Sequence, residues 1–170
     1  MSRTFYVNGD FVAEENARIS VLDRGFLFAD AVYEVSTVLQ GKLIDNKAHL
    51  KRLWRSMSEL SMAPPCAEEE IEAAQLKLIE LNDLEEGLLY LQVSRGVADR
   101  DFAFPTKAQS SLVMFTQAKN LLNSPMAETG LHVISIPDLR WKRRDIKTVG
   151  LLAPSLGKQS ALDAGVHDAW

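Results

Sequence analysis

Apolar and polar residues alternate in two stretches near the start of the chain, which is the pattern of β-strands with one buried face. The first stretch, FYVNGDFV (residues 5–12), places Asn8-Gly9 between two apolar, β-favouring pieces. This dipeptide readily adopts the positive φ angles that a two-residue hairpin turn requires. We therefore expect the chain to open with a β-hairpin.

The second stretch, AVYEVSTVLQGKLID (residues 31–45), is rich in Val, Tyr and Thr and is interrupted by Gln40-Gly41. It predicts a second hairpin. Because successive side chains of a strand point to opposite faces, the alternation separates two sets of residues. One face carries Tyr33, Val35 and Thr37, and the other carries Glu34, Ser36 and Val38.

Two helical patterns follow. After a plausible cap at Asp45 or Asn46, apolar residues recur every three or four positions, which predicts a helix with Lys51, Arg52 and Arg55 off its apolar stripe. The stripe comprises Leu50, Leu53, Trp54, Met57 and Leu60. Residues 62–82 begin with Pro-Pro and a run of glutamates, which suits a first helical turn. Its core positions are Ile71, Leu78 and Leu81.

The remaining pattern predicts strands at 87–96, 110–118 and 131–139, a helix at 151–165 and the start of a strand at 166–170. A long polar loop (97–107) joins the first two of these strands and is a candidate for binding. We interpret the chain as α+β, with a small N-terminal domain (1–120), a linker (121–128) and the incomplete start of a larger, β-rich C-terminal domain (129–170).

Composition excludes several classes of function. A net charge of -4 disfavours a broad nucleic-acid or anionic-membrane surface, and the longest apolar run is far too short to span a bilayer. The single cysteine, Cys66, cannot form an internal disulfide, which fits a reducing cytoplasm. The three histidines stand apart in the sequence, so we expect no metal site. Phosphate-binding glycine motifs and the G-x-S-x-G motif of hydrolases are absent from the sequence.

Four segments carry the main functional signal. They are DRGFLFADAVYEV (23–35), HLKRLWRSMSEL (49–60), YLQVSRGVADRDFAFP (90–105) and RRDIKTVGLLAPSLGKQ (143–159). Their order and content resemble the fold-type IV pyridoxal-phosphate enzymes, and most closely the D-amino-acid aminotransferases. Branched-chain aminotransferases and aminodeoxychorismate lyases are relatives within the same fold.

This resemblance implies that Lys147 forms the Schiff base with pyridoxal 5'-phosphate and then moves the proton of the substrate. It implies that Arg52 binds the cofactor phosphate, since a guanidinium can hold two phosphate oxygens through paired donors. Taken without the resemblance, Lys147 would be one more charge of a basic cluster and Arg52 an ordinary solvent-facing arginine.

The resemblance also assigns substrate-binding residues. Tyr33 matches a tyrosine that faces the cofactor and helps to hold the substrate carboxylate. Arg100 matches the arginine of the carboxylate-binding motif and Tyr90 a nearby pocket tyrosine, and in the family both reach the active site of the other subunit. A homodimer acting on an amino acid and a 2-oxo acid is therefore implied.

The chain departs from the family pattern in three places. Phe102 stands where the carboxylate-binding motif has a histidine, which removes one donor and alters carboxylate binding. Ala29 and Ala31 replace frequent glycines. The region that supplies the carboxylate facing the pyridinium nitrogen in the family has no counterpart before Trp170, so we expect a truncated chain with part of an active site.

Three functions remain open from the sequence. The first is transfer of the amino group of a D-alanine-like amino acid to a 2-oxo acid. The second is the activity of a relative of the same fold, either an aminodeoxychorismate lyase or a branched-chain aminotransferase. The third is a non-catalytic fragment that serves as a dimerisation module.

Overall fold

The computed structural model describes residues 2–170, and its internal contacts divide the chain into two compact units. The first unit comprises the residues up to Lys119 together with Ile146–Val149, and the second comprises Asn120–Asp145 with Gly150–Trp170. The segment around Lys147 thus belongs to the first unit. The domain and linker boundaries given above stay predictions.

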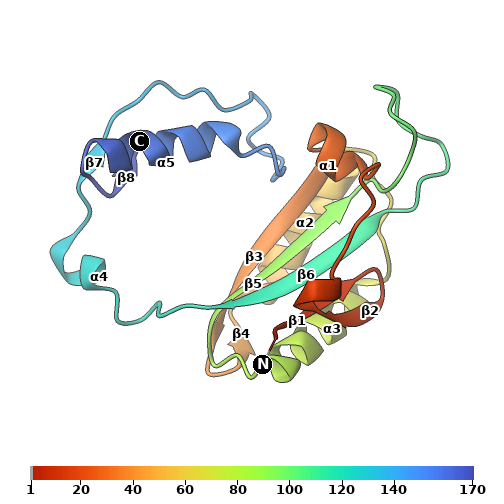
Figure 1. The fold of residues 1–170 in the computed structure, drawn as a ribbon, viewed down its shortest axis with the longest axis horizontal. Helices are drawn as coiled ribbons and strands as arrows, with labels where there is room; N and C mark the ends of the chain where they lie inside the picture. The colour runs from red at the N-terminus through yellow and green to blue at the C-terminus, as the bar shows by residue number, and fades with distance from the viewer. Residues whose placement is uncertain (1) are drawn as a thin grey trace. The chain divides into compact units, whose positions relative to one another are not determined.

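The first unit is built on a six-stranded sheet in the order β2-β1-β6-β5-β3-β4, with antiparallel pairing throughout (Figure 1). Its strands are β1 (Thr4–Val7), β2 (Asp10–Ala13), β3 (Ala31–Leu39), β4 (Lys42–Leu43), β5 (Glu86–Ser94) and β6 (Ser111–Ala118). A 3-10 turn, η1 (Glu14–Asn16), and a short helix, α1 (Arg24–Phe28), connect β2 to β3.

Both predicted hairpins are confirmed. The turn between β1 and β2 consists of Asn8 and Gly9 at φ angles of 50° and 108°, and the turn between β3 and β4 consists of Gln40 and Gly41 at 51° and 70°. These positive φ angles give a two-residue turn the twist of its flanking strands. The local sequence alone therefore determines where these two strand pairs form.

Two helices, α2 (Asn46–Glu59) and α3 (Glu68–Leu81), pack on the same face of the sheet (Figure 1). The core between them and the sheet is apolar and includes Leu53, Met57, Ile71, Leu78, Leu89, Leu91 and Met114. The predicted separation of the two faces of β3 is confirmed: Glu34, Ser36 and Val38 point toward this side, where they are buried with Val32, and Tyr33, Val35 and Thr37 point toward the opposite face.

One core position was predicted wrongly. Leu81 is 42% exposed, whereas Leu84 is buried at 5%. The helix ends at Leu81. The side-chain amide of Asn82 then accepts the Thr4 N–H at 2.7 Å and donates to the Thr4 carbonyl at 2.9 Å. This pairing turns the chain at the helix end, so that the next apolar residue, Leu84, enters the core.

The second unit contains α4 (Pro125–Thr129), α5 (Leu152–Asp163) and a parallel pair of short strands, β7 (Val133–Ile134) and β8 (Asp168–Ala169). The strand predicted at 131–139 is thus only two residues long, because its pairing extends only along the two residues of β8. Gly157 of α5 lies against Ile136, whose Cδ1 would be 2.8 Å from an added Cβ, so a larger residue there would make the end of the Ile136 side chain move. Among residues 2–170, no helix combines the length and the hydropathy that crossing a bilayer requires.

Gly96, directly after β5, offers a test of the loop that follows it. Its φ is +97°, and a Cβ there would lie 1.8 Å from the carbonyl oxygen of Gln109. We expect Gly96→Ala to lower the free energy of unfolding by at least about 2 kcal/mol, because both the backbone angle and the contact become unfavourable. Urea denaturation measures this loss.

Gly9→Ala is the matched control, because Gly9 also has a positive φ, +108°, but a Cβ there meets nothing within 4 Å. It should cost only about 1 kcal/mol, the penalty of the backbone angle. Equal losses in the two variants would show that the contact with Gln109 is unimportant.

Candidate active site

Lys147 lies on a short segment that extends the sheet beside β3. The N–H of Tyr33 donates to the carbonyl of Lys147 at 3.0 Å, and the N–H of Val149 donates to the carbonyl of Ala31 at 3.2 Å. The partner strand β4 reaches only Val38 and Leu39, which leaves this end of β3 available. Pairing with β3 fixes the backbone of Lys147 although the two segments are far apart in the sequence.

Strand alternation then decides where the Lys147 side chain points. Its neighbour Ile146 is 3% exposed and joins the core. Lys147 therefore lies on the opposite face, where its Nζ is 4.0 Å from the centroid of the Tyr33 ring. A cation over a tyrosine ring is held by the quadrupole of the ring, so Tyr33 positions the amine.

Tyr33 is the first ring of an aromatic row that crosses the sheet. It stacks on Tyr90 at 5.6 Å, Tyr90 stacks on Phe115 at 4.8 Å, and Phe115 stacks on Phe5 at 5.4 Å. Burial, together with the nearby Tyr33, raises the pKa of Tyr90 to about 12, and its hydroxyl donates to Gln92 Oε1 at 2.8 Å. The structure thus brings three predicted residues of one chain together: Lys147, Tyr33 and Tyr90.

Arg52 forms a bidentate ion pair with Glu34 of β3. Its Nε and Nη2 each donate to one Glu34 carboxylate oxygen at 2.6 Å, and these bonds raise the pKa of Arg52. Glu34 is 1% exposed, and it also contacts Nδ1 of His49 at 2.9 Å. The pair anchors one edge of the guanidinium and fixes its plane.

The other edge of Arg52 is available to a ligand. A guanidinium carries five N–H groups, and the contacts with Glu34 and His49 use none of those on Nη1. The Arg52 side chain is 47% exposed. It is therefore a rigidly held cation with open donors, which suits a phosphate or carboxylate group.

Ser56 connects Arg52 to Lys147. Ser56 follows Arg52 by four residues in α2, so both lie on one face of the helix about one turn apart. The Ser56 Oγ accepts the backbone N–H of Lys147 at 3.4 Å. The backbone of Lys147 is thus tied to α2, the helix that also carries Arg52.

Arg100 does not join this group. It lies in the loop after β5, where its guanidinium is over Phe28 at 5.3 Å and over Phe102 at 5.6 Å. Phe102, at the position of the family's histidine, is 79% exposed. Arg100 is therefore packed against Phe28 and Phe102 rather than against Lys147 or Arg52.

Sequence reasoning missed Glu34 and His49 as site residues. A signal for Glu34 was present, because a carboxylate on the core face of a predicted strand needs a cationic partner. His49 and Arg52 stand three residues apart in α2, which is the spacing of neighbours on one helical face. The other two histidines, which were predicted to be isolated, are in contact with each other. The backbone N–H of His132 donates to Nδ1 of His167 at 2.9 Å.

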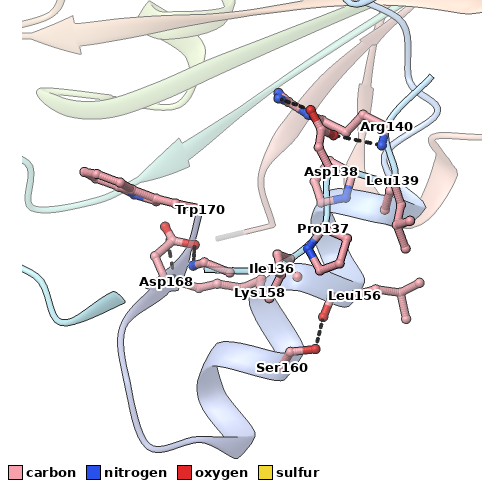
Figure 2. A pocket seen from close by; sticks show the side chains of 14 residues that line it. Ile136, Pro137, Asp138, Leu139, Arg140, Leu156, Lys158, Ser160, Asp168 and Trp170 are labelled. Carbon is pink, nitrogen blue, oxygen red and sulfur yellow. Dashed lines mark hydrogen bonds and ion pairs between the residues drawn. The ribbon is translucent and has the colours of Figure 1, made fainter. Parts of the chain in front are cut away.

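The second unit has a separate groove of about 620 Å³ between α5 and residues 136–140 (Figure 2). Its walls include Leu139, Leu156 and Trp170, with the ion pair of Asp138 and Arg140 at its edge (Figure 2). The five residues predicted for the active site do not line this groove. We therefore centre the candidate site on Lys147 in the first unit.

Comparison with known proteins identifies the family of the chain. A family model described as class IV amino-transferase matches residues 31–170. The D-alanine aminotransferase of Staphylococcus aureus is 35% identical over 165 residues, which cover 96% of this chain and 58% of that protein. The D-alanine aminotransferase of Listeria monocytogenes is 35% identical over 168 residues, covering 95% of this chain and 58% of that protein.

The fold agrees as well. The branched-chain amino acid aminotransferase of Escherichia coli superposes with a TM-score of 0.86 at 16% identity, covering 99% of this chain and 59% of that one. At this identity the likeness concerns the fold alone. The chain spans about 58% of the length of the curated relatives that it matches. Since the family model covers most of its residues, the chain belongs to the class IV aminotransferase family.

Proposed function

We propose that this chain carries the lysine centre of a pyridoxal-phosphate-dependent aminotransferase, which moves the amino group of a D-alanine-like amino acid to a 2-oxo acid. The observation that carries the proposal is the position of the Lys147 amine over the Tyr33 ring, on a segment whose backbone is bonded to Ser56 of α2, the helix that also carries Arg52. The D-alanine aminotransferases at 35% identity support the choice of substrate.

The residues present fit the cofactor. Arg52 offers its open edge to the phosphate while Glu34 holds the opposite edge. Lys147 offers a primary amine to the aldehyde, and its backbone is fixed by β3 and Ser56. Both groups belong to the first unit, so a single compact unit supplies the anion-binding donors and the amine.

When bound, pyridoxal phosphate supplies a ring that accepts the electrons left as the substrate α-proton departs. The Lys147 amine would take this proton from the α-carbon and deliver it to the cofactor in the first half of the reaction, and it would carry out the reverse transfer in the second half. The Tyr33 ring keeps the amine in place, and its hydroxyl helps to bind the substrate carboxylate. Tyr90 stays protonated well above neutral pH, because burial raises its pKa to about 12, and so it donates hydrogen bonds and carries no charge.

We further propose that the active form is a homodimer in the cytoplasm. Arg100 would then bind the substrate carboxylate in the site of the other subunit, whereas Tyr90, which stacks on Tyr33, would line the site of its own chain. The outward position of Arg100, on a loop with the exposed Phe102, is consistent with a role outside its own unit.

An assay of amino-group transfer tests this proposal. With pyridoxal phosphate added, the chain should convert D-alanine and 2-oxoglutarate into pyruvate and glutamate in equal amounts, and L-leucine should be a much poorer donor. Pyruvate release from aminodeoxychorismate without an amino acceptor would instead identify a lyase. Preference for L-leucine would identify a branched-chain enzyme, and a folded chain with none of these three activities would identify a non-catalytic module.

A further inference from the structure

A buried ion network lies at the base of the loop that carries Arg100. The Nε atoms of Arg24 and Arg95 both donate to one oxygen of Asp30, at 2.8 and 2.7 Å. All three side chains are less than one-tenth exposed. Two guanidinium groups thus share one carboxylate, so the network holds one positive charge in excess, which is costly unless other groups compensate it.

Backbone carbonyls supply this compensation from two directions. Arg95 donates to the carbonyls of Leu60 and Ser61, at 2.8 and 3.2 Å, just after α2. Arg24 donates from Nη1 to the carbonyl of Asp101 at 2.6 Å and to that of Ala103 at 3.4 Å. The excess charge is therefore compensated by carbonyls of the loop, which Arg24 contacts, and by carbonyls at the end of α2, which Arg95 contacts.

Aromatic rings of the loop and of α1 also pack against these arginines. The Phe104 ring lies 3.6 Å from the guanidinium carbon of Arg95. Phe28 is shared, since Arg24 is 4.7 Å and Arg100 is 5.3 Å from its ring centroid. Arg100 is thus held through the backbone of its neighbour Asp101 and through a ring that also contacts Arg24.

We propose that Arg24, with Asp30 and Arg95, is a positioning residue that presents Arg100 to the substrate carboxylate. This inference rests on the proposed function, because it assumes that Arg100 binds the carboxylate of the amino acid. The network does not contact the lysine centre itself. It acts on substrate affinity by fixing residues 99–104 in one conformation.

Arg24→Lys tests the network with the charge retained. A single ammonium group lacks the fork of donors that reaches Asp30 and two loop carbonyls together. We expect the KM for D-alanine to rise about tenfold, in keeping with the loss of one charge-assisted hydrogen bond. The kcat and the affinity for pyridoxal phosphate should stay nearly unchanged, and amide hydrogen exchange should become faster in residues 99–104. Arg18→Lys, at an exposed arginine outside the network, is the control.

A double-mutant cycle separates positioning from a general structural effect. In an Arg100→Met background, Arg24→Lys should no longer raise the KM, because the group that it positions has been removed. Phe104→Leu removes the aromatic ring that packs on Arg95, at an exposed site, and should also raise the KM. It replaces Arg24→Lys in the test if that variant does not fold.

The two proposals fail differently in this experiment. A wild-type chain that transfers no amino group overturns the proposed function. An active wild type in which Arg24→Lys leaves the KM unchanged, or raises it equally with and without Arg100, overturns the positioning role alone.

Discussion

Lys147→Ala is expected to lower the rate of amino-group transfer by at least about a thousandfold. A loss of this size is typical when a positioned general acid or base is removed. The structure holds the primary amine of Lys147 over the Tyr33 ring, at 4.0 Å from its centroid. The side chain is half-buried and outside the core, so the variant should keep its fold. The rate of pyruvate formation from D-alanine measures the loss, and circular dichroism checks the fold.

The control for this prediction is Lys142→Ala, which removes an exposed lysine from the basic cluster just before Asp145. It should keep nearly full activity. A Lys147→Ala variant that retains a rate near that of Lys142→Ala would mean that Lys147 is an ordinary surface charge.

Arg52→Met is expected to weaken the binding of pyridoxal phosphate by about 10- to 100-fold, which corresponds to the loss of one charge-assisted pair of hydrogen bonds. The methionine keeps the length of the side chain but removes every donor. A titration of cofactor absorbance or of tryptophan fluorescence gives the dissociation constant, and inorganic phosphate should compete more weakly with the variant than with the wild type.

Arg52→Met also leaves Glu34 buried without its main partner, so part of its effect could come from a less stable fold. The variant with Glu34→Gln in addition removes that charge and should recover stability but not cofactor affinity. Lys51→Met removes one positive charge from an exposed neighbouring position of α2. Equal weakening in Lys51→Met and Arg52→Met would mean that general charge, and not the held guanidinium, attracts the cofactor.

Local signals explain which parts of the fold were predictable. The turns at Asn8-Gly9 and Gln40-Gly41 and the helical spacing of α2 are encoded within a few residues, so the sequence was sufficient for them. The wrong placement of Leu81 has a long-range cause, the bonding of Asn82 to Thr4. Such a contact leaves no periodic trace in the sequence.

The candidate site divides in the same way. Lys147 and Arg52 were found through resemblance of motifs, since neither charge is unusual in its own segment. Their arrangement depends on the pairing of Lys147 with Tyr33 and on the Ser56 contact, which joins segments distant in sequence. The network of Arg24, Asp30 and Arg95 was missed because each residue has its partner in another element.

The most direct test of the account is to locate the covalently bound cofactor. The purified chain is incubated with pyridoxal phosphate, reduced with borohydride and digested, and the labelled peptide is sequenced by mass spectrometry. We predict one label per chain, on the peptide that contains Lys147. A chain that takes up no label, or whose label is spread over other lysines at equal levels, would contradict the assignment of Lys147 as the centre of the site.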